Sequence, residues 1–334
     1  MKQTALKLMH SGGAFAPFRF LNRNKVLILM YHRFAERAGG VSIAAADFES
    51  HLKYLNQHYN VVSLSEAVSQ FRENGKAKKR TAVITIDDGY NDAYFVALPL
   101  LRKYAMPATL FVVTDFLDQN IWLWTDKLRY VLLNTQKPAC EYQSGEKLIT
   151  LQLTDRRSRF QVAGAINSCL KRIDNNEKDK AIEELAHSLQ VSIPEIPTAE
   201  FAALNWDQAR ELEHGDVEIG SHTHTHPILT QIQPDRVRWE LRKSKSRAEE
   251  MLQHEITLFC YPNGVSDDEI RTETKSSGYT SAVSAKPGLN GPKDDLFALR
   301  RIAADHDLPH FAQNTSGFEG LKNVFRFARS SEVS

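Results

Sequence analysis

Short apolar runs alternate with amphipathic segments along most of the chain. The runs are apolar at consecutive positions and rich in β-branched and aromatic residues, which predicts strands buried on both faces. The segments between them place apolar residues three and four positions apart, which predicts helices. The predicted strands cover residues 25–32, 60–64, 81–86, 108–113, 217–220, 257–261, 280–283 and 299–303. At least seven strand–helix units in a row favour an α/β fold with a closed, TIM-like barrel over an open sheet.

The predicted helices follow the strands and carry recognisable start signals. Asp47 is the expected N-cap of the first, and Ser65 that of the second. The helices are expected at residues 47–56, 65–73, 93–104, 236–252 and 267–277. The polar residues of interest come directly after strand ends, where parallel barrels place their active sites.

The alternation fails between about residues 117 and 203. A helical pattern runs from Trp122 to Leu132, and residues 155–190 resemble two further, charge-rich helices. We interpret this stretch as a largely helical insertion near the top of the barrel. Trp122 and Trp124 fit either a platform on which sugars stack or the core of the insertion, and the core is favoured.

Composition narrows the classes of protein. The 334 residues carry a net charge of +1, so there is no global basic field to gather nucleic acid. The three cysteines, Cys140, Cys169 and Cys260, are widely spaced and odd in number. They predict buried thiols in a reducing compartment, with neither a disulfide framework nor a cysteine zinc site.

The first 25 residues have a composition of their own. No apolar stretch is long enough for a signal peptide core or a transmembrane helix, so a cytoplasmic location is expected. Basic residues alternate here with Phe15, Phe18, Phe20 and Leu21, and the first acid is Glu36. This pattern predicts peripheral contact with the inner face of an anionic membrane. The alternative is an ordinary terminal segment whose aromatic side chains pack on the domain.

Two distant segments have the residues of one metal site. Asp87 and Asp88 end an apolar strand, and His222 and His226 stand four positions apart. One carboxylate with two imidazoles is a common ligand set for a hydrolytic divalent metal, which leaves the other carboxylate free as a base. His-x3-His would fit one face of a helical turn, and His224 lies off that face. Taken separately, Asp-Gly is often only a turn, and histidines often lie on polar loops.

Two further strand ends offer chemistry. His32 follows the first strand and could be a general acid, or a histidine hydrogen-bonded to backbone. Tyr261-Pro262-Asn263-Gly264 is either a plain turn or a turn whose backbone N–H groups face a developing oxyanion.

These motifs resemble the polysaccharide deacetylases with a NodB homology domain, carbohydrate esterase family 4. Thr85-Ile86-Asp87-Asp88-Gly89 is similar to the family's T-F-D-D-G motif, and His222-Thr223-His224-Thr225-His226 to its H-[ST]-x-x-H motif. The resemblance covers roughly residues 26–115 and 203–305. It implies a distorted (β/α)7 barrel, with Asp87 as general base and a divalent metal on Asp88, His222 and His226. Zn²⁺ is the expected ion, and other transition metals stay open.

The third motif departs from the commonest form, R-x-P-Y-G. Tyr261-Pro262-Asn263-Gly264 resembles a branch with Y-P-x-G, in which an arginine from elsewhere stands beside the base. Arg301 is the candidate, with Arg300 as the alternative. In the same branch the catalytic histidine comes early, in a Y-H motif, which points to His32. Tyr261 and Asn263 then fall at the oxyanion or substrate position.

The resemblance implies a metal-dependent N-deacetylase that releases acetate from N-acetylhexosamine units of a glycan or a lipid-linked saccharide. Two alternatives stay open: a hydrolase of small non-sugar amides on the same fold, and a non-catalytic relative that binds glycans. The expected organisation is a basic and aromatic segment at 1–25, the deacetylase barrel at 26–310 and a tail at 311–334. The sequence leaves the oligomeric state open.

Overall fold

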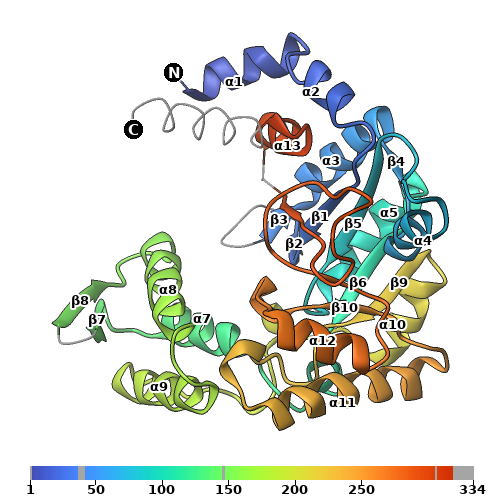
Figure 1. Ribbon diagram of the computed structural model, residues 1–334. Helices are drawn as coiled ribbons and strands as arrows, with labels where there is room; N and C mark the ends of the chain where they lie inside the picture. The colour runs from blue at the N-terminus through green and yellow to red at the C-terminus, as the bar shows by residue number, and fades with distance from the viewer. Residues whose placement is uncertain (1, 37–41, 145–146, 305–306, 319–334) are drawn as a thin grey trace, which may run out of the picture.

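A curled parallel sheet forms the centre of the computed structural model, which describes residues 2–36, 42–144, 147–304 and 307–318 (Figure 1). The strand order is β11-β10-β9-β6-β5-β1-β12, and β4 pairs with β5 beside this path. The strands are β1 (Leu27–Tyr31), β4 (Asn60–Val61), β5 (Thr81–Ile86), β6 (Ala108–Val112), β9 (Val217–Ser221), β10 (Leu258–Cys260), β11 (Ser281–Val283) and β12 (Ile302–Ala303).

The two ends of the sheet meet. β12 pairs with β1 through Leu29 and Ile302, and a parallel bridge joins Val283 of β11 to Leu299, just before β12. The predicted (β/α)7 barrel is therefore confirmed. Every residue of β5 and β6 is buried, as the uninterrupted apolar runs require.

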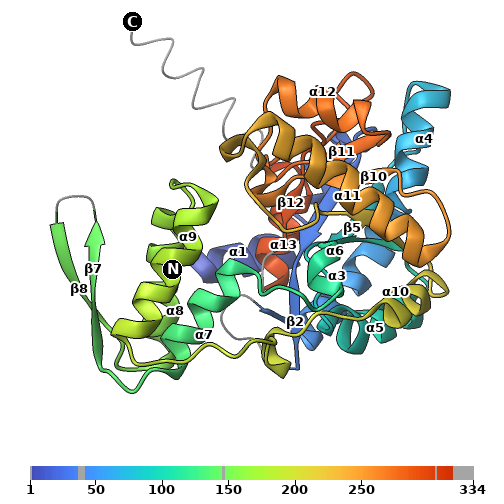
Figure 2. The ribbon, with the colours of Figure 1, turned by 90° about the horizontal axis from the view of Figure 1, so that it is seen from below.

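Helices cover the outside of the sheet (Figures 1 and 2). They are α3 (Ala45–His58), α4 (Leu64–Asn74), η1 (Ala93–Ala97), α5 (Leu98–Tyr104), α6 (Thr114–Leu117), α10 (Trp206–Glu213), α11 (Pro234–Leu252) and α12 (Asp268–Ser276). Both predicted caps were wrong by two or three positions. Ala44 precedes α3 without a side-chain cap, so Asp47 lies in the first turn, and Ser63 caps α4 by accepting from the Glu66 N–H at 3.2 Å. Ser63 is the N-cap because its backbone is still extended, as the conformation of an N-cap residue requires.

The predicted insertion forms a separate layer of α7 (Trp124–Asn134), α8 (Arg156–Leu170) and α9 (Asn175–Ser188). Its helices bury a core of their own around Leu128, Val131 and Ile166. A hairpin of β7 (Ala139–Ser144) and β8 (Lys147–Gln152) projects from these helices, and the prediction missed it (Figure 2). In the described part of the chain, β7 and β8 pair with each other and with no strand of the main sheet.

The N-terminal segment folds as α1 (Lys2–Ser11) and α2 (Ala16–Leu21). α1 contacts α13 (Leu308–Thr315), so a helix crosses the predicted boundary between barrel and tail at 310. Phe15 is buried and Phe18 packs against Phe318, whereas Phe20 and Leu21 are exposed. Most of the predicted tail lies outside the described residues. Among the described residues, no helix combines the length and the apolar character needed to span a bilayer.

Candidate metal centre and active site

The candidate residues meet at the carboxyl ends of neighbouring strands. The register pairs Tyr31 with Ile86, so His32 and Asp87 are the next residues on adjacent strands. Ser221 pairs with both Val112 and Phe259, which places His222 between the ends of β6 and β10. The side chains line a cavity of about 360 Å³. The predicted residues along it are Asp87, Asp88, His222, His226, His32, Tyr261, Asn263 and Arg301.

Asp88, His222 and His226 form a compact ligand set. Asp88 Oδ1 lies 3.5 Å from Nε2 of each histidine, and the three ligand atoms lie within 4.8 Å of one another. His222 donates its Nδ1–H to the Cys260 carbonyl at 2.8 Å, which orients the ring so that Nε2 faces Asp88. Burial, followed by the charge of His222, lowers the pKa of His226 to about 4, so this imidazole is neutral. Burial lowers the pKa of His222, but Cys260 and Asp88 raise it by more, so its net shift is upward and a bound metal would displace its proton. Two imidazoles and a carboxylate suit a divalent transition metal.

The two histidines do not share a helical turn, and that expectation was wrong. The segment after β9 is a loop in which Thr223 has φ 71° and His226 φ 60°, and Asp88 likewise has φ 80°. Non-glycine residues with positive φ are uncommon and costly, and they concentrate at functional sites. The loop therefore turns His226 back toward His222, with ring centroids 4.8 Å apart.

His224 lies outside the ligand set, although the helical turn on which that expectation rested does not form. Its Nδ1 is 2.7 Å from Thr114 Oγ1, and its ring packs edge-on against Trp239. It holds the loop to α6 and α11 instead.

Asp87 is held by Arg301. The guanidinium donates Nη1–H to Oδ1 at 2.7 Å and Nη2–H to Oδ2 at 2.8 Å, and both side chains are buried. Burial raises the pKa of Asp87, but Arg301 and then His32 lower it further, so the net shift is downward and the carboxylate is ionised. Arg301 thus takes the position beside the base. Arg300 instead pairs with Asp294, 3.1 Å away.

His32 stands at the mouth of the cavity. Its Nε2 lies 3.7 Å from Asp87 Oδ2, and its side chain is 43% exposed. An imidazole with one face on the acid and one on the cavity can exchange a proton with a bound ligand.

The family model described as "Polysaccharide deacetylase" matches residues 74–282, more than half of the chain. The chain belongs to the polysaccharide deacetylase family. It is therefore a hydrolase of carbon–nitrogen bonds other than peptide bonds.

Several relatives of this deacetylase are known. "Putative polysaccharide deacetylase YxkH" of Bacillus subtilis (strain 168) is 22% identical over 279 residues, which cover 83% of this chain and 71% of that protein. A poly-beta-1,6-N-acetyl-D-glucosamine N-deacetylase of Staphylococcus aureus is 29% identical over 112 residues, 29% of this chain and 39% of that enzyme.

Solved structures share the fold. The deacetylase PplD of Streptococcus pyogenes, in complex with acetate, superposes with a TM-score of 0.58 at 20% identity, over 87% of this chain and 98% of that chain. IcaB from Ammonifex degensii superposes with a TM-score of 0.57 at 17% identity, over 87% and 97%.

In the third motif of this deacetylase, the two candidate oxyanion residues, Tyr261 and Asn263, differ in whether their donors are already used. Tyr261 donates its N–H to the Val283 carbonyl and its hydroxyl to the Phe297 carbonyl, so neither donor is available to a substrate. The structure thus gives no support to the donor role expected of Tyr261. Asn263 has φ 55°, and its Nδ2 is buried with no hydrogen-bond partner among the described residues. An unpaired buried donor beside the ligand set is available to a substrate carbonyl.

Asn263→Ala is expected to lower kcat by about 10²-fold, the usual loss when one oxyanion donor is removed. Alanine is strained at the φ of 55° found here, whereas glycine adopts it readily. Asn263→Gly also lacks the side-chain donor, so it is the control that separates backbone strain from loss of the donor. Acetate release at saturating substrate measures the effect. Full activity in both variants would exclude a donor role for this side chain.

Cys260 was missed as a site residue. Its Sγ lies 3.2 Å from Arg301 Nη2 and 3.6 Å from Asp87 Oδ2. Asp87, His222 and Cys260 also satisfy the distances of a ligand set. Burial raises the pKa of the Cys260 thiol, and Arg301 already occupies both Asp87 oxygens, so the Asp88 set is the better metal site. Of the other cysteines, Cys140 is buried as predicted and Cys169 is partly exposed.

Glu240 of α11 was also missed, because it stands in a charge-rich segment that reads as a solvated face. Its side chain is fully buried. Oε2 accepts the backbone N–H groups of His224 and Thr225, each at 2.9 Å, and Oε1 accepts the Thr225 hydroxyl at 2.5 Å. This carboxylate therefore holds the loop that carries His226.

Glu240→Ala is expected to reduce metal affinity about 10- to 100-fold, as removal of an outer-shell partner does. Two backbone donors would also lose their acceptor, which lowers the free energy of unfolding by about 2–4 kcal/mol. Metal titration and denaturant unfolding measure the two effects. Glu250→Ala, on the exposed side of the same helix, is the control and should change neither.

The insertion completes the site. Thr125 and Arg129 of α7 and Asn167 and Lys171 of the α8 region line the same cavity as Asp87. No sequence motif marks these four residues, because the tertiary packing alone brings the insertion over the barrel. Trp122 and Trp124 are 6% and 8% exposed. Trp124 belongs to the core of the insertion, but both side chains also line the larger cavity beside it, so the structure is compatible with both interpretations.

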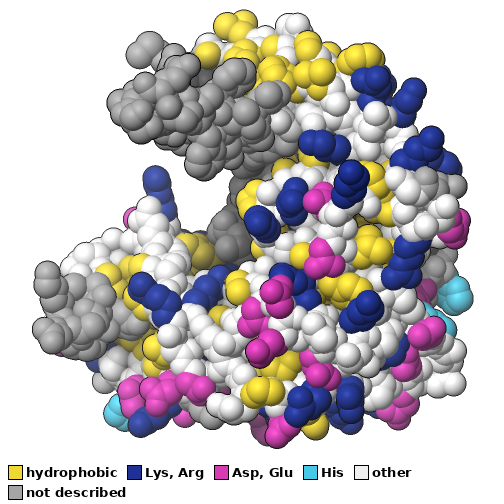
Figure 3. Space-filling view, in the orientation of Figure 1, with side chains coloured by type: hydrophobic (Ala, Val, Ile, Leu, Met, Phe, Trp, Pro, Cys, Tyr) yellow, Lys and Arg dark blue, Asp and Glu magenta, His cyan; other side chains and the backbone are white. Residues whose placement is uncertain are grey.

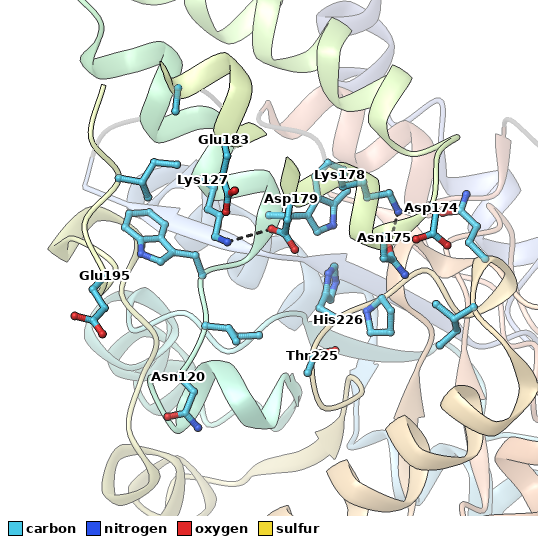
Figure 4. Close-up of a pocket in the computed structure, with 18 of the residues that line it drawn as sticks. Asn120, Lys127, Asp174, Asn175, Lys178, Asp179, Glu183, Glu195, Thr225 and His226 are labelled. Atoms are coloured by element: carbon cyan, nitrogen blue, oxygen red, sulfur yellow. Dashed lines mark hydrogen bonds and ion pairs between the residues drawn. The ribbon is translucent and has the colours of Figure 1, made fainter. Parts of the chain in front are cut away.

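A larger cavity of about 1080 Å³ lies between the insertion and the barrel and shares His226 with the catalytic cavity (Figure 4). Lys127 pairs with Asp179 on one wall at 3.1 Å. Lys178, which precedes Asp179 on α9, donates to Asn175 Oδ1 at 2.6 Å, and burial lowers its pKa to about 8. The cavity gives a substrate room to extend beyond the reacting group.

Proposed function

We propose that this deacetylase is a metal-dependent N-deacetylase that releases acetate from N-acetylhexosamine units of a glycan or a lipid-linked saccharide. The observation that carries the proposal is the Asp88, His222 and His226 ligand set beside an ionised Asp87 that Arg301 holds in place. A divalent metal at these ligands would polarise the acetamide carbonyl and acidify a water.

The protein side chains supply the proton transfers. Asp87 takes a proton from the attacking water, since it is ionised and adjoins the ligand set. Asn263 donates to the carbonyl oxygen as negative charge develops on it. His32 gives a proton to the departing amine, which is a poor leaving group without one. The products are a free amino sugar and acetate.

Two observations support the proposed substrate: the name of a relative and the size of the cavity beside His226. The staphylococcal relative is named as an N-deacetylase of poly-N-acetylglucosamine. The cavity of about 1080 Å³ next to His226 is large enough for sugars that flank the reacting unit. A small-amide hydrolase would not need this room.

The test is acetate release by the zinc-loaded protein. N-acetylglucosamine oligomers and lipid-linked saccharides are expected to yield acetate, and a panel of small amides and ureides is not. Release from the small amides alone would favour the non-sugar hydrolase. No release from any substrate, with metal bound, would contradict deacetylation. The remaining hypothesis would then be a non-catalytic relative that binds glycans.

We also propose that residues 1–25 contact an anionic membrane surface. Half of the exposed large apolar side chains among the described residues lie in this segment: Leu8, Met9, Phe20 and Leu21. Basic side chains flank them and no acid does; Figure 3 shows the apolar side chains gathered at the N-terminal end of the molecule. The cytoplasmic location at an inner membrane face stays a prediction.

Phe20→Ser combined with Leu21→Ser is expected to reduce binding to vesicles at least about tenfold, since two apolar side chains no longer enter the interface. The vesicles contain phosphatidylcholine with or without phosphatidylglycerol, and co-sedimentation measures binding. The control is Ile196→Ser, which removes an apolar side chain of similar exposure, 62%, elsewhere. Equal binding by all three proteins would contradict a membrane role for this segment.

A further inference from the structure

Two cations of the insertion face the catalytic cavity. Arg129 comes from α7, and Lys171 directly follows α8. Both line the cavity of about 360 Å³ that holds Asp87 and Asp88. Neither residue belongs to a motif of the barrel, so their presence here is a property of the insertion.

One positive charge of this pair is not balanced among the described residues. Lys171 has no ion pair within the described parts of the chain, and burial, followed by the charge of Arg129, lowers the pKa of its ammonium group. Arg129 uses only Nη1, which donates to Asp126 Oδ1 at 2.7 Å. Asp126 also accepts the Tyr90 hydroxyl at 2.6 Å, so its two oxygens are engaged. The remaining N–H groups of Arg129 have no partner among the described residues.

The acids of the cavity cannot supply the missing balance. Arg301 occupies both oxygens of Asp87, and Asp88 faces His222 and His226. Placing two cations together in a partly buried cavity costs free energy unless an anion joins them. A guanidinium with free N–H groups beside an ammonium group is the usual arrangement for a phosphate or a carboxylate.

Neighbouring polar groups fit a saccharide. Asn167 lies on α8, shortly before Lys171, and lines the same cavity. Its Oδ1 is buried and has no hydrogen-bond partner among the residues that the structure describes. An amide oxygen accepts from a hydroxyl and would repel an anion, so it marks where the sugar lies next to the charged group.

We propose that Arg129 and Lys171 form an anion subsite, and that the substrate carries a phosphate or carboxylate group next to the N-acetyl sugar that is deacetylated. The inference rests on the proposed function, because the anion is placed relative to the reacting sugar. Arg129 donates in-plane N–H groups to the anion, Lys171 supplies a point charge, and Asn167 accepts from a sugar hydroxyl.

The test compares three saccharides with the zinc-loaded protein. Diacetylchitobiose is neutral, N-acetylglucosamine 1-phosphate carries a phosphate, and an N-acetylglucosaminyl glucuronate carries a carboxylate. We expect kcat/KM to be at least about tenfold higher for one anionic saccharide than for the neutral one, and the two anionic arms identify which group fits. Lys171→Gln should reduce the ratio of kcat/KM for the anionic saccharide to kcat/KM for the neutral one about tenfold, because a hydrogen bond to a charged group contributes about that much. Lys171→Arg should restore this ratio.

A binding measurement separates this inference from catalysis. Calorimetry with the Asp87→Asn protein should show the same preference for the anionic saccharide and its loss when Lys171→Gln is added. The control is Arg156→Gln, a charge removed from the exposed start of the same helix, which should leave the ratio unchanged. Equal kcat/KM and equal affinity for neutral and anionic saccharides would overturn the anion subsite and leave deacetylation intact. Absence of acetate from all three, with preferential anion binding preserved, would instead contradict the proposed function.

Discussion

Asp87→Asn is expected to lower kcat by about 10³-fold while the protein still binds metal. A positioned general base contributes roughly 10²–10⁴-fold, and the amide cannot take the proton of the attacking water. Asn retains the shape of the side chain and an oxygen that can accept from Arg301, so the buried arginine keeps a partner. Acetate release at saturating metal and substrate measures kcat, and elemental analysis of the dialysed protein measures bound metal.

The control for this change is Asp115→Asn. Asp115 is a carboxylate at the start of α6, 3.7 Å from His224 and outside the ligand set. It should retain parental activity and metal. Thermal unfolding of Asp87→Asn checks that the loss of the ion pair has not unfolded the site. Parental kcat in the folded Asp87→Asn protein would show that another group is the base.

His222→Ala is expected to lower the affinity for a divalent metal by more than about 100-fold. Changes to residues that merely orient a ligand already cost 10- to 100-fold, and His222 is itself a proposed ligand with its Nδ1–H fixed by the Cys260 carbonyl. Competition against a chelator of known affinity measures the loss. Activity should vanish at one equivalent of zinc and return in part at excess zinc. Asp88→Asn should behave alike, since an amide is a weak ligand.

The chain provides a matched control in the same loop. His224→Ala also removes a buried imidazole, but that ring contacts Thr114 and Trp239 and not Asp88. It should lower stability and leave metal affinity within a few-fold of the parent. Equal losses of metal affinity in the His222 and His224 variants would mean that loop order, and not ligation, explains both.

The barrel could be predicted from the sequence because its strands are buried on both faces. β5 and β6 have apolar residues at consecutive positions, and no other element with this pattern fits a short segment between helices. Helix starts were less predictable. Ser63 and Ser65 are equally good caps by residue type, and only the extended backbone at Ser63 selects between them.

The hairpin of β7 and β8 was missed for a different reason. Its strands pair only with each other and project from the insertion, so no burial by the main sheet imposes an apolar pattern on them (Figure 2). In the site, Glu240 was missed because its neighbours on α11 are charged, which is typical of a solvated face. The close approach of the histidine loop buries it, and that approach is a tertiary event.

By itself, the sequence determined the barrel and the strand ends that carry the chemistry, because strand periodicity and side-chain type are local properties. The resemblance to the family implied which carboxylate is the ligand and which is the base. Tertiary structure decided which of these groups meet. It selected Arg301 over Arg300 as the partner of Asp87, engaged both donors of Tyr261, and left Asn263 Nδ2 with no partner among the described residues. It also placed Arg129 and Lys171 over the site. Contacts between residues so distant in the chain depend on how whole elements pack, and no local pattern of residues encodes that packing.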